Sequence, residues 1–354
     1  MEGLAMALAP HPTALHSLAS YARAVRPHLP DVVFAPNRAR LAWLPVHVAV
    51  ITALAAALAT GWLPAALWPA ASLGLGLTLA ASAFLGHEIL HGAIVRGRRT
   101  IHVLGGLCLL PFTLSPTLWV HWHNRVHHHG CAQVGRDPDM YPTLAEYEAQ
   151  PFARLLADYF GLGGRRWRSV LSLLIGFTGQ SQQMLWQARQ LGLLTARQHR
   201  RALAETGLGV AAWATLGGAL GGTVFVFVYV LPLVVANATV MAFILTNHSL
   251  SALTPGVNDP LVNSLTVTLP RPLAWLSLGF GYHVEHHVFP AISARHAPRV
   301  RRVLLALFPA RYQALPLPEA LRRLYRSGRV YRDDHTLIDP RTGTGPPALR
   351  PRDG

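Results

Sequence analysis

The chain contains 354 residues, of which 51% are hydrophobic and only 13% charged, and its mean hydropathy is +0.29. Soluble domains carry about 25% charged residues, so this composition excludes an ordinary soluble globule, a disordered chain and a disulfide scaffold. The net charge is +15, and all the basic residues other than histidine are arginine. Nucleic-acid-binding proteins are not built around long uncharged apolar stretches. We therefore expect no nucleic-acid partner, and assign the charge to contact with anionic lipid headgroups or an acidic carrier.

Residues 1–40 form a predicted N-terminal arm, which lacks the basic start of a cleaved signal peptide. Residues 41–86 then contain no Asp, Glu, Lys or Arg. A membrane-spanning helix needs about 20 apolar residues, so this stretch accommodates two spans, at about 45–60 and 65–86. The short turn between them favours a tight helical hairpin.

Two shorter apolar stretches follow, at residues 101–120 and 167–177. The first is interrupted by Pro111 and Pro116, and the second directly follows a basic run. We expect both to lie in the membrane interface or to dip into the membrane without crossing it.

A second uncharged stretch covers residues 206–258, with Gly221-Gly222 at the expected turn. It predicts two further spans, at about 206–220 and 224–245. The fold class is therefore an all-α integral membrane protein with two transmembrane helical hairpins. We expect one membrane domain over residues 41–312 and a C-terminal tail over residues 313–354, with little fixed structure from Asp339.

The arginines predict the orientation of these hairpins. The turns within the hairpins contain none, whereas the arm, the central segment 96–201 and the chain after Arg271 are rich in them. The positive-inside rule places these segments in the cytoplasm. Both termini and a helical cap between and after the hairpins should therefore be cytoplasmic.

Histidines are concentrated in three motifs. HEILH at 87–91 lies at the cytoplasmic end of the second predicted span, HNRVHH at 123–128 lies in the central segment, and HVEHH at 283–287 follows the fourth predicted span. Residues four apart share one helix face, so His87 and His91 can bind one metal. Adjacent histidines diverge by about 100° and can serve two metals. The two cysteines form no zinc-binding pair. The eight histidines of the three motifs favour a two-metal centre: His87, His91, His123, His127, His128, His283, His286 and His287.

Other interpretations of these motifs remain open. An isolated HExxH is the signature of zinc proteases, with the glutamate as general base. Such a protease would use one metal and leave the other two motifs without a role. A metal-binding membrane protein without catalytic activity is a further alternative.

In order and in position relative to the paired spans, the three motifs resemble the three histidine boxes of the membrane fatty acid desaturases. The stretch GYHVEHHVFPAISARHAP is especially similar to the third box of acyl-lipid and acyl-CoA desaturases. The resemblance covers residues 41–312. It implies a non-haem di-iron centre held by the eight motif histidines, with O2 as co-substrate. It also implies His248 as a further ligand and Asn247 as a water-mediated contact.

Histidine ligands usually donate their second ring N–H to a carboxylate or a carbonyl. Acidic residues are scarce, so we take as candidates for this role Glu88, Asp137, Asp139 and Glu285. Asp259 is a further candidate for this role, but we expect it to pair with an arginine instead.

The resemblance implies desaturation of a fatty acyl chain that is carried by a lipid, by CoA or by an acyl carrier. The electrons would come from a separate ferredoxin- or cytochrome-like protein. Some residues depart from the desaturase pattern: Glu88 stands where many desaturases have Asp, and Gly92 and Asp137-Pro138-Asp139 resemble carotenoid ketolases. A hydroxylase or ketolase of carotenoids or sphingolipids is therefore the alternative function.

Overall fold

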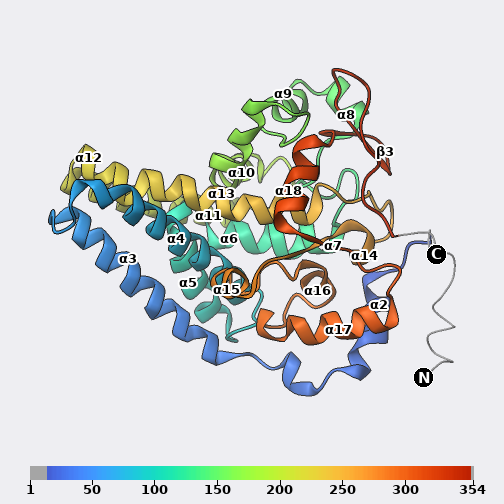
Figure 1. Cartoon of the computed structure of the whole chain (residues 1–354), viewed down its shortest axis with the longest axis horizontal. Helices are drawn as coiled ribbons and strands as arrows, with labels where there is room; N and C mark the ends of the chain where they lie inside the picture. Colours follow the sequence, from blue (N-terminus) through green and yellow to red (C-terminus); the bar gives the residue numbers. More distant parts are fainter. Residues whose placement is uncertain (1–13, 352–354) are drawn as a thin grey trace.

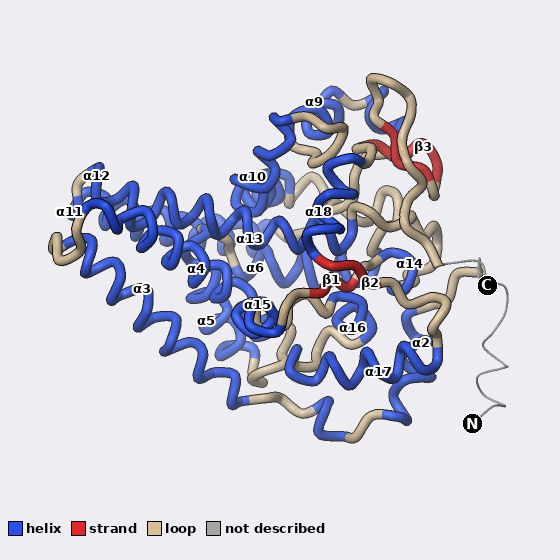
Figure 2. Tube along the Cα trace, in the orientation of Figure 1, coloured by secondary structure: helices blue, strands red, loops and turns tan. Residues whose placement is uncertain are grey.

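The computed structural model describes residues 14–351. Residues 1–13 of the predicted arm and residues 352–354 of the predicted tail lie outside this range. The described chain is mostly helical, with two small two-stranded sheets and long connecting loops (Figure 2). The α-helices are α2 (Leu18–Val25), α3 (Trp43–Ala59), α4 (Trp68–Leu90), α5 (Arg98–Leu109), α6 (Pro116–Trp119), α7 (His128–Gly130), α8 (Leu144–Ala149), α9 (Pro151–Tyr159), α10 (Leu171–Gln187), α11 (Ala196–Leu220), α12 (Gly222–Phe225), α13 (Leu231–His248), α14 (Pro260–Asn263), α15 (Arg271–Leu276), α16 (His283–Val288), α17 (Ala297–Leu307) and α18 (Leu317–Arg326).

Two π-helices continue neighbouring α-helices, and short 3-10 helices link others. The π-helices are η6 (Val120–His127) and η8 (Val226–Val230). The 3-10 helices are η1 (Arg26–His28), η2 (Asp31–Phe34), η3 (Arg38–Ala42), η4 (Ala65–Leu67), η5 (Leu110–Phe112), η7 (Trp167–Val170) and η9 (Ala294–His296). The strands are β1 (Thr266–Thr268), β2 (Ala314–Pro316), β3 (Val330–Asp333) and β4 (Thr336–Ile338).

Within the described residues, three helical segments are long and apolar enough to cross a membrane: Arg38–Ala59, Ala65–Leu90 and Gly222–His248. They correspond to three of the four predicted spans. The predicted span at 206–220 is not among them. It forms the second half of α11, which begins at Ala196 with three arginines and Glu205 in its first ten residues. Frequent glycine and threonine further reduce its hydropathy, so composition alone does not establish the fourth span.

The predicted interfacial stretch 101–120 forms two arms that meet at a sharp bend. The chain bends by 108° between helices Arg98–Phe112 and Pro116–Gly130, which together are apolar enough for a broken span or a re-entrant loop. Each arm has 15 residues, or about 22 Å of helix, which is shorter than the roughly 30 Å hydrocarbon core. The prediction that this segment dips into the membrane without a continuous crossing agrees with this geometry.

Glu205 of α11 stabilises this bend. Its carboxylate accepts hydrogen bonds from the Ser115 hydroxyl at 2.6 Å, from the Thr117 hydroxyl at 2.9 Å and from the Thr117 amide at 3.1 Å. The His102 ring lies 2.8 Å away and the Arg201 guanidinium 2.7 Å away. Burial opposes ionisation, but these donors outweigh it and lower the pKa of Glu205 to about 2.

We expect Glu205→Gln to lower the melting temperature of the detergent-solubilised protein at pH 7. Because the folded-state pKa lies below the unfolded value of about 4.3, the carboxylate stabilises the fold above pH 4.3. This contribution is lost as the pH falls towards 2. The difference in melting temperature between the natural protein and Glu205→Gln should therefore become smaller as the pH falls from about 4.3 towards 2. Glu148→Gln, at an exposed side chain, is the control. A gap that does not change with pH would contradict this assignment.

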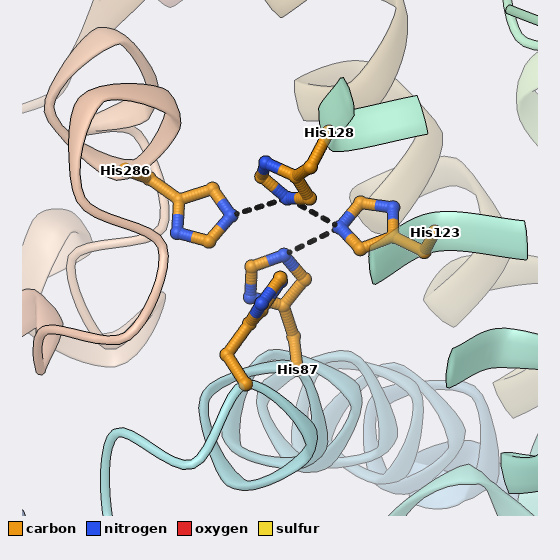
Figure 3. Close-up of side chains that lie close together, drawn as sticks. His87, His123, His128 and His286 are labelled. Carbon is orange, nitrogen blue, oxygen red and sulfur yellow. Dashed lines mark hydrogen bonds between the residues drawn. The ribbon is translucent and has the colours of Figure 1, made fainter. Parts of the chain in front are cut away.

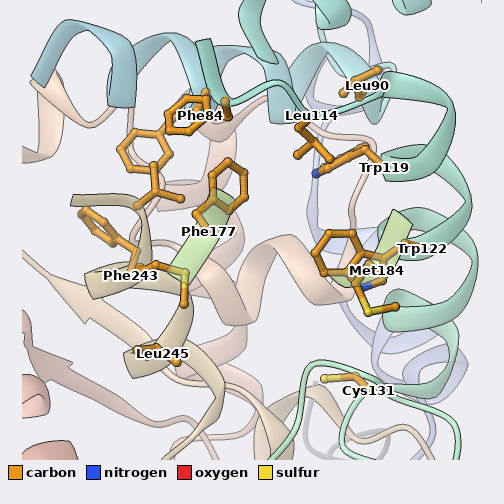
Figure 4. Close-up of a cluster of buried hydrophobic side chains, with 14 of the residues drawn as sticks. Phe84, Leu90, Leu114, Trp119, Trp122, Cys131, Phe177, Met184, Phe243 and Leu245 are labelled. Carbon is orange, nitrogen blue, oxygen red and sulfur yellow. The ribbon is translucent and has the colours of Figure 1, made fainter. Parts of the chain in front are cut away.

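The centre of the molecule is formed by α4, which packs against α13, α5 and α3, while α10 packs on the other side of α13. Their buried side chains form one large apolar cluster that includes Phe84, Phe177 and Phe243 (Figure 4). At Gly76 the backbones of α4 and α13 come so close that an added Cβ would lie 2.5 Å from the Cβ of Val235 and 2.7 Å from the carbonyl oxygen of Pro232. Small residues commonly allow such approaches between membrane helices.

We expect Gly76→Ala to push α4 and α13 apart and to cost about 1–3 kcal/mol of stability, the usual range for overpacking. Thermal unfolding in detergent measures this loss. Gly218→Ala in α11 is the matched control, since a Cβ there meets nothing within 4 Å. Because alanine favours a helix over glycine, the control should be neutral or stabilised. Equal melting temperatures for the two variants would contradict the close approach.

Both ends of the described chain pack against the body of the molecule: α2 contacts α16 and α17, and the end of the tail bonds to the segment that follows α13 (Figure 1). Strand β2 pairs in parallel with β1, and β3 pairs with β4. The prediction that the chain has little fixed structure from Asp339 is wrong. The Asp339 amide donates to Thr344 at 2.9 Å and the Leu349 amide donates to Leu250 at 2.7 Å. Contacts with distant segments order this part of the tail, despite its Pro- and Arg-rich composition.

Figure 1 also shows how the long helices relate to the histidine motifs. The connections α3–α4 and α11–α12 lie together at one tip of the molecule, whereas α7 and α16 lie towards the other end. The chain therefore leaves the region of the motifs through each hairpin and returns to it.

Candidate metal centre

Nine histidines from four distant segments meet at the ends of the long helices. His87 lies in the last turn of α4 and His91 is the residue that directly follows the helix, with their ring centroids 4.6 Å apart. The second motif lies in η6 and α7, and the third motif forms α16. His248 is the last residue of α13. The structure therefore brings together all eight histidines of the predicted motifs, together with His248.

The π-helix determines how the second motif is displayed. The His128 amide donates to the His123 carbonyl, five residues earlier. In an α-helix, residues five apart diverge by about 140°, but the wider π turn places them on one face. The Nε2 atoms of His123 and His128 consequently lie 3.2 Å apart. His127 points to a different group of ligands.

The first group contains five imidazoles whose ligand atoms all lie within 4.8 Å of one another. Figure 3 shows a chain of three contacts within it, from His87 to His123, from His123 to His128 and from His128 to His286. The corresponding Nε2–Nε2 distances are 3.2, 3.2 and 3.1 Å. The members of this first group are His87, His91, His123, His128 and His286.

The second group lies beside the first and combines His127, His248 and His287 with the thiol of Cys131. His283 borders this second group, with its Nε2 atom 2.6 Å from that of His248 and 3.1 Å from that of His287. Each adjacent pair is therefore divided. His127 and His287 belong to the second group, whereas their neighbours belong to the first.

The donor atoms fit two cations. Only one of two apposed imidazole nitrogens can donate a proton to the other, and the Nε2 of His123 faces two partners at once. The buried Nε2 of His91 has no hydrogen-bond partner in the described chain. Burial, together with the neighbouring imidazoles, lowers the pKa of His286 and His287 well below 6.5, so both rings are neutral and able to ligate a metal.

Of the acidic residues that were predicted to support a histidine, Asp137 does so directly. Its Oδ1 lies 3.0 Å from the Nδ1 of His127, and its Oδ2 accepts from the Ala132 amide. Burial opposes ionisation of Asp137, but His127 and the hydrogen bonds outweigh it and lower its pKa. The Oδ2 of Asp139 lies 3.4 Å from the same ring nitrogen of His127. Burial, with the nearby Asp137 carboxylate, raises the pKa of Asp139.

The other three predicted supporting residues do not contact a histidine of the centre through a hydrogen bond in the described structure. Glu88 pairs with Arg40 and accepts from Ser293. Glu285 accepts from Thr266 and Tyr312. The buried side-chain amide of Asn247 has no partner among the described protein atoms. These residues lie near the motifs in the sequence, but none of their side chains is hydrogen-bonded to a histidine of the centre.

Asp259, in contrast, pairs with an arginine as predicted. Its fully buried carboxylate lies 2.7 Å from the Arg311 guanidinium. Cys131 is a member of the second group that sequence reasoning missed. Its Sγ lies 3.6 Å from the Nδ1 of His248, and its position three residues after His128 was the available signal. His121 and His129, which flank the second motif, bond to backbone carbonyls and belong to neither group.

A cavity of about 830 Å³ borders the histidines. Its walls come mainly from α4, η6, α10 and α13, and most of the side chains are apolar, among them Phe84, Trp119, Phe177, Ile244 and Phe280. A second cavity of about 450 Å³ also borders His87 and His283, and shares Phe84 and Phe280 with the first. A mostly apolar lining with a few polar groups is typical of ligand-binding sites. The histidines can therefore act on a hydrocarbon held beside them.

Comparisons with known proteins agree with this geometry. A family model described as fatty acid desaturase matches residues 60–316. The human protein sphingolipid delta(4)-desaturase/C4-monooxygenase DES2 is 44% identical over 45 residues. This stretch spans only 13% of the present chain and 13% of the human protein.

Proposed function

The chain belongs to the fatty acid desaturase family, and from this premise we propose that it is a membrane-bound di-iron enzyme that desaturates a fatty acyl chain with O2. Membership in the family makes it an oxidoreductase that acts on lipids. The proposal of a di-iron desaturase rests on one observation: nine imidazoles form two compact groups beside one apolar cavity.

The ligands of the two irons would be drawn from these two groups. His87, His91, His123, His128 and His286 would hold one ion, and His127, His248, His283 and His287 the other. Neutral imidazole binds iron well. When bound, the metal pair supplies the activation of O2 and the removal of hydrogen from an unactivated methylene.

The protein's own residues would orient the substrate and exclude water. Phe84, Phe177 and Phe280 line the cavity next to His87 and His283, so a hydrocarbon chain in the cavity would pass close to the metal ligands. Asp137 would fix the orientation of His127 by accepting a hydrogen bond from its Nδ1–H group.

The orientation in the membrane remains the one that the arginines predict, with both termini and the histidines in the cytoplasm. The electron donor would be a separate ferredoxin- or cytochrome-like protein that approaches from this side. The arginine-rich surface supports a donor of acidic character.

Expression in a host with saturated membrane lipids tests this function. The host must also supply a compatible reductase, and acyl chains are profiled by mass spectrometry. We expect new unsaturated chains with the natural chain and none with His123→Ala. Metal analysis should give two irons per chain, whereas a zinc protease would contain one zinc ion. Unchanged lipids alongside an iron-loaded protein and an active reductase would contradict desaturation.

Hydroxylation is the second candidate function, and a specific observation favours it. Asp139 and Gln180 place polar groups in the wall of the cavity next to His127. The name of the similar human protein also combines desaturase with monooxygenase. Incorporation of labelled oxygen from O2 into the lipid product would identify this outcome.

A further inference from the structure

The wall of the larger cavity carries one polar feature that the proposed di-iron chemistry does not use. Asp139 and Gln180 both border the cavity, among side chains that are otherwise mostly apolar or histidine. Placing a carboxylate beside an apolar cavity is unfavourable unless it gains hydrogen bonds. The bonds that these two residues make, and those that they leave unused, therefore indicate what the cavity binds.

Asp139 is held firmly from one side. Its Oδ1 accepts from the indole N–H of Trp122 at 2.9 Å and from the amide of Gln180 at 2.9 Å. Its backbone amide donates to Asp137. The carboxylate is therefore fixed in place before any ligand enters.

The second oxygen of Asp139 retains capacity to accept a hydrogen bond. It lies 3.4 Å from the Nδ1 of His127, but the single proton on that nitrogen is already directed to Asp137, at the shorter distance of 3.0 Å. Asp137 thus provides the orientation of His127. Supporting this histidine does not account for Asp139.

Gln180 offers a second unused group at the same wall. Its amide nitrogen donates to Asp139, and its carbonyl oxygen makes no hydrogen bond within the described chain. The neighbouring residues of α10 are fixed, since the Thr178 amide donates to Asn237 at 2.8 Å and Gln182 donates to Thr113. Gln180 is therefore presented by a rigid helix.

This polar pair lies close to the candidate metal ligands. The ligand atoms of Asp139, His123 and His127 all lie within 4.8 Å of one another. A substrate oxygen atom bound by Asp139 and Gln180 would consequently lie close to the metal site. Along the substrate chain, only a few carbon atoms would separate it from the carbon that faces the metals.

We propose that Asp139 and Gln180 form a hydrogen-bonding subsite for a hydroxyl group on the substrate, close to the carbon that is oxidised. The hydroxyl would donate its proton to the free carboxylate oxygen of Asp139 and would accept a hydrogen bond from the second N–H of the Gln180 side-chain amide, whose first N–H donates to Asp139. The substrate class is therefore a long-chain lipid with an oxygen function near the reacting methylene, rather than a plain saturated chain. This inference rests on the proposed function, and specifies its substrate.

The test compares two lipids that differ in one oxygen atom, a saturated N-acyl sphinganine and its 3-deoxy analogue. Binding to the iron-loaded protein is measured under anaerobic conditions, and turnover with O2 and a reductase is measured separately. Hydrogen bonds to charged groups contribute enough for about tenfold or greater preference. We expect the natural protein to bind and convert the hydroxylated lipid at least about tenfold better.

Gln180→Leu should reduce this preference towards one, mainly through weaker binding of the hydroxylated lipid, with little change for the deoxy lipid. Gln183→Leu is the matched control, because Gln183 lies on the same helix, bonds to Gln187 and does not border the cavity. Equal binding of the two lipids by the natural protein would overturn the subsite, as would equal losses for both lipids in Gln180→Leu. Preferential binding without any turnover would support the subsite and contradict the proposed function.

Discussion

Replacing His91 with alanine is expected to leave about one iron per chain, and replacing His287 is expected to remove the other. His91 belongs to the first group of imidazoles, and its buried Nε2 has no hydrogen-bond partner among residues 14–351. His287 belongs to the second group. Because each residue serves a different ion, each variant should lose one ion and retain the other.

Activity should fall by more than about 100-fold in both variants, since the loss of a ligand exceeds the 10–100-fold cost of losing an outer partner. Iron is measured by elemental analysis of the purified protein, and activity by lipid profiling. His129→Ala is the control, because His129 is exposed and bonds only to the carbonyl of Asn124. If either variant kept two irons and full activity, the division into two groups would be wrong.

Asp137→Asn is expected to weaken iron binding by about 10–100-fold, the usual effect of removing the partner of a metal-bound histidine. The substitution keeps the shape of the side chain but removes the charge that faces His127 at 3.0 Å. The remaining ligands keep the first ion in place, so the loss should fall mainly on the ion held by the second group. Iron content after dialysis against graded chelator concentrations measures this effect.

Glu285→Gln provides the matching comparison. Glu285 lies within the third motif, but its carboxylate bonds to Thr266 and Tyr312 and to no histidine. We therefore expect iron affinity to be retained in this variant, whatever its effect on stability. Equal losses of iron in both variants would show that proximity in the sequence, rather than contact with the histidine, determines the role of these carboxylates.

Much of the metal centre could be predicted from the sequence, because the spacing of histidines within one short segment determines which of them lie on the same helix face. His87 and His91 share a face since the His91 amide, directly after α4, still donates to the His87 carbonyl. The apolar stretches predicted the three helical segments that are long enough to span a membrane. The pairing of Asp259 with an arginine was also correct. Residue spacing within one helix decides which way neighbouring side chains point, so such patterns can be interpreted without knowledge of the rest of the fold.

Only the tertiary structure decided how the histidines are shared. The π-helix brings His123 into line with His128 and directs His127 to the other group, and no residue in that stretch signals the wider turn. The choice of Asp137 over Glu88 and Glu285 depends on how the loop after α7 folds back onto His127. The meeting of Asp139 with Gln180 depends on a contact between segments 41 residues apart in the chain. The same reason explains the ordered tail after Asp339. The sequence around a residue determines on which face of its helix the side chain lies. The packing of whole helices determines which residue the side chain then contacts.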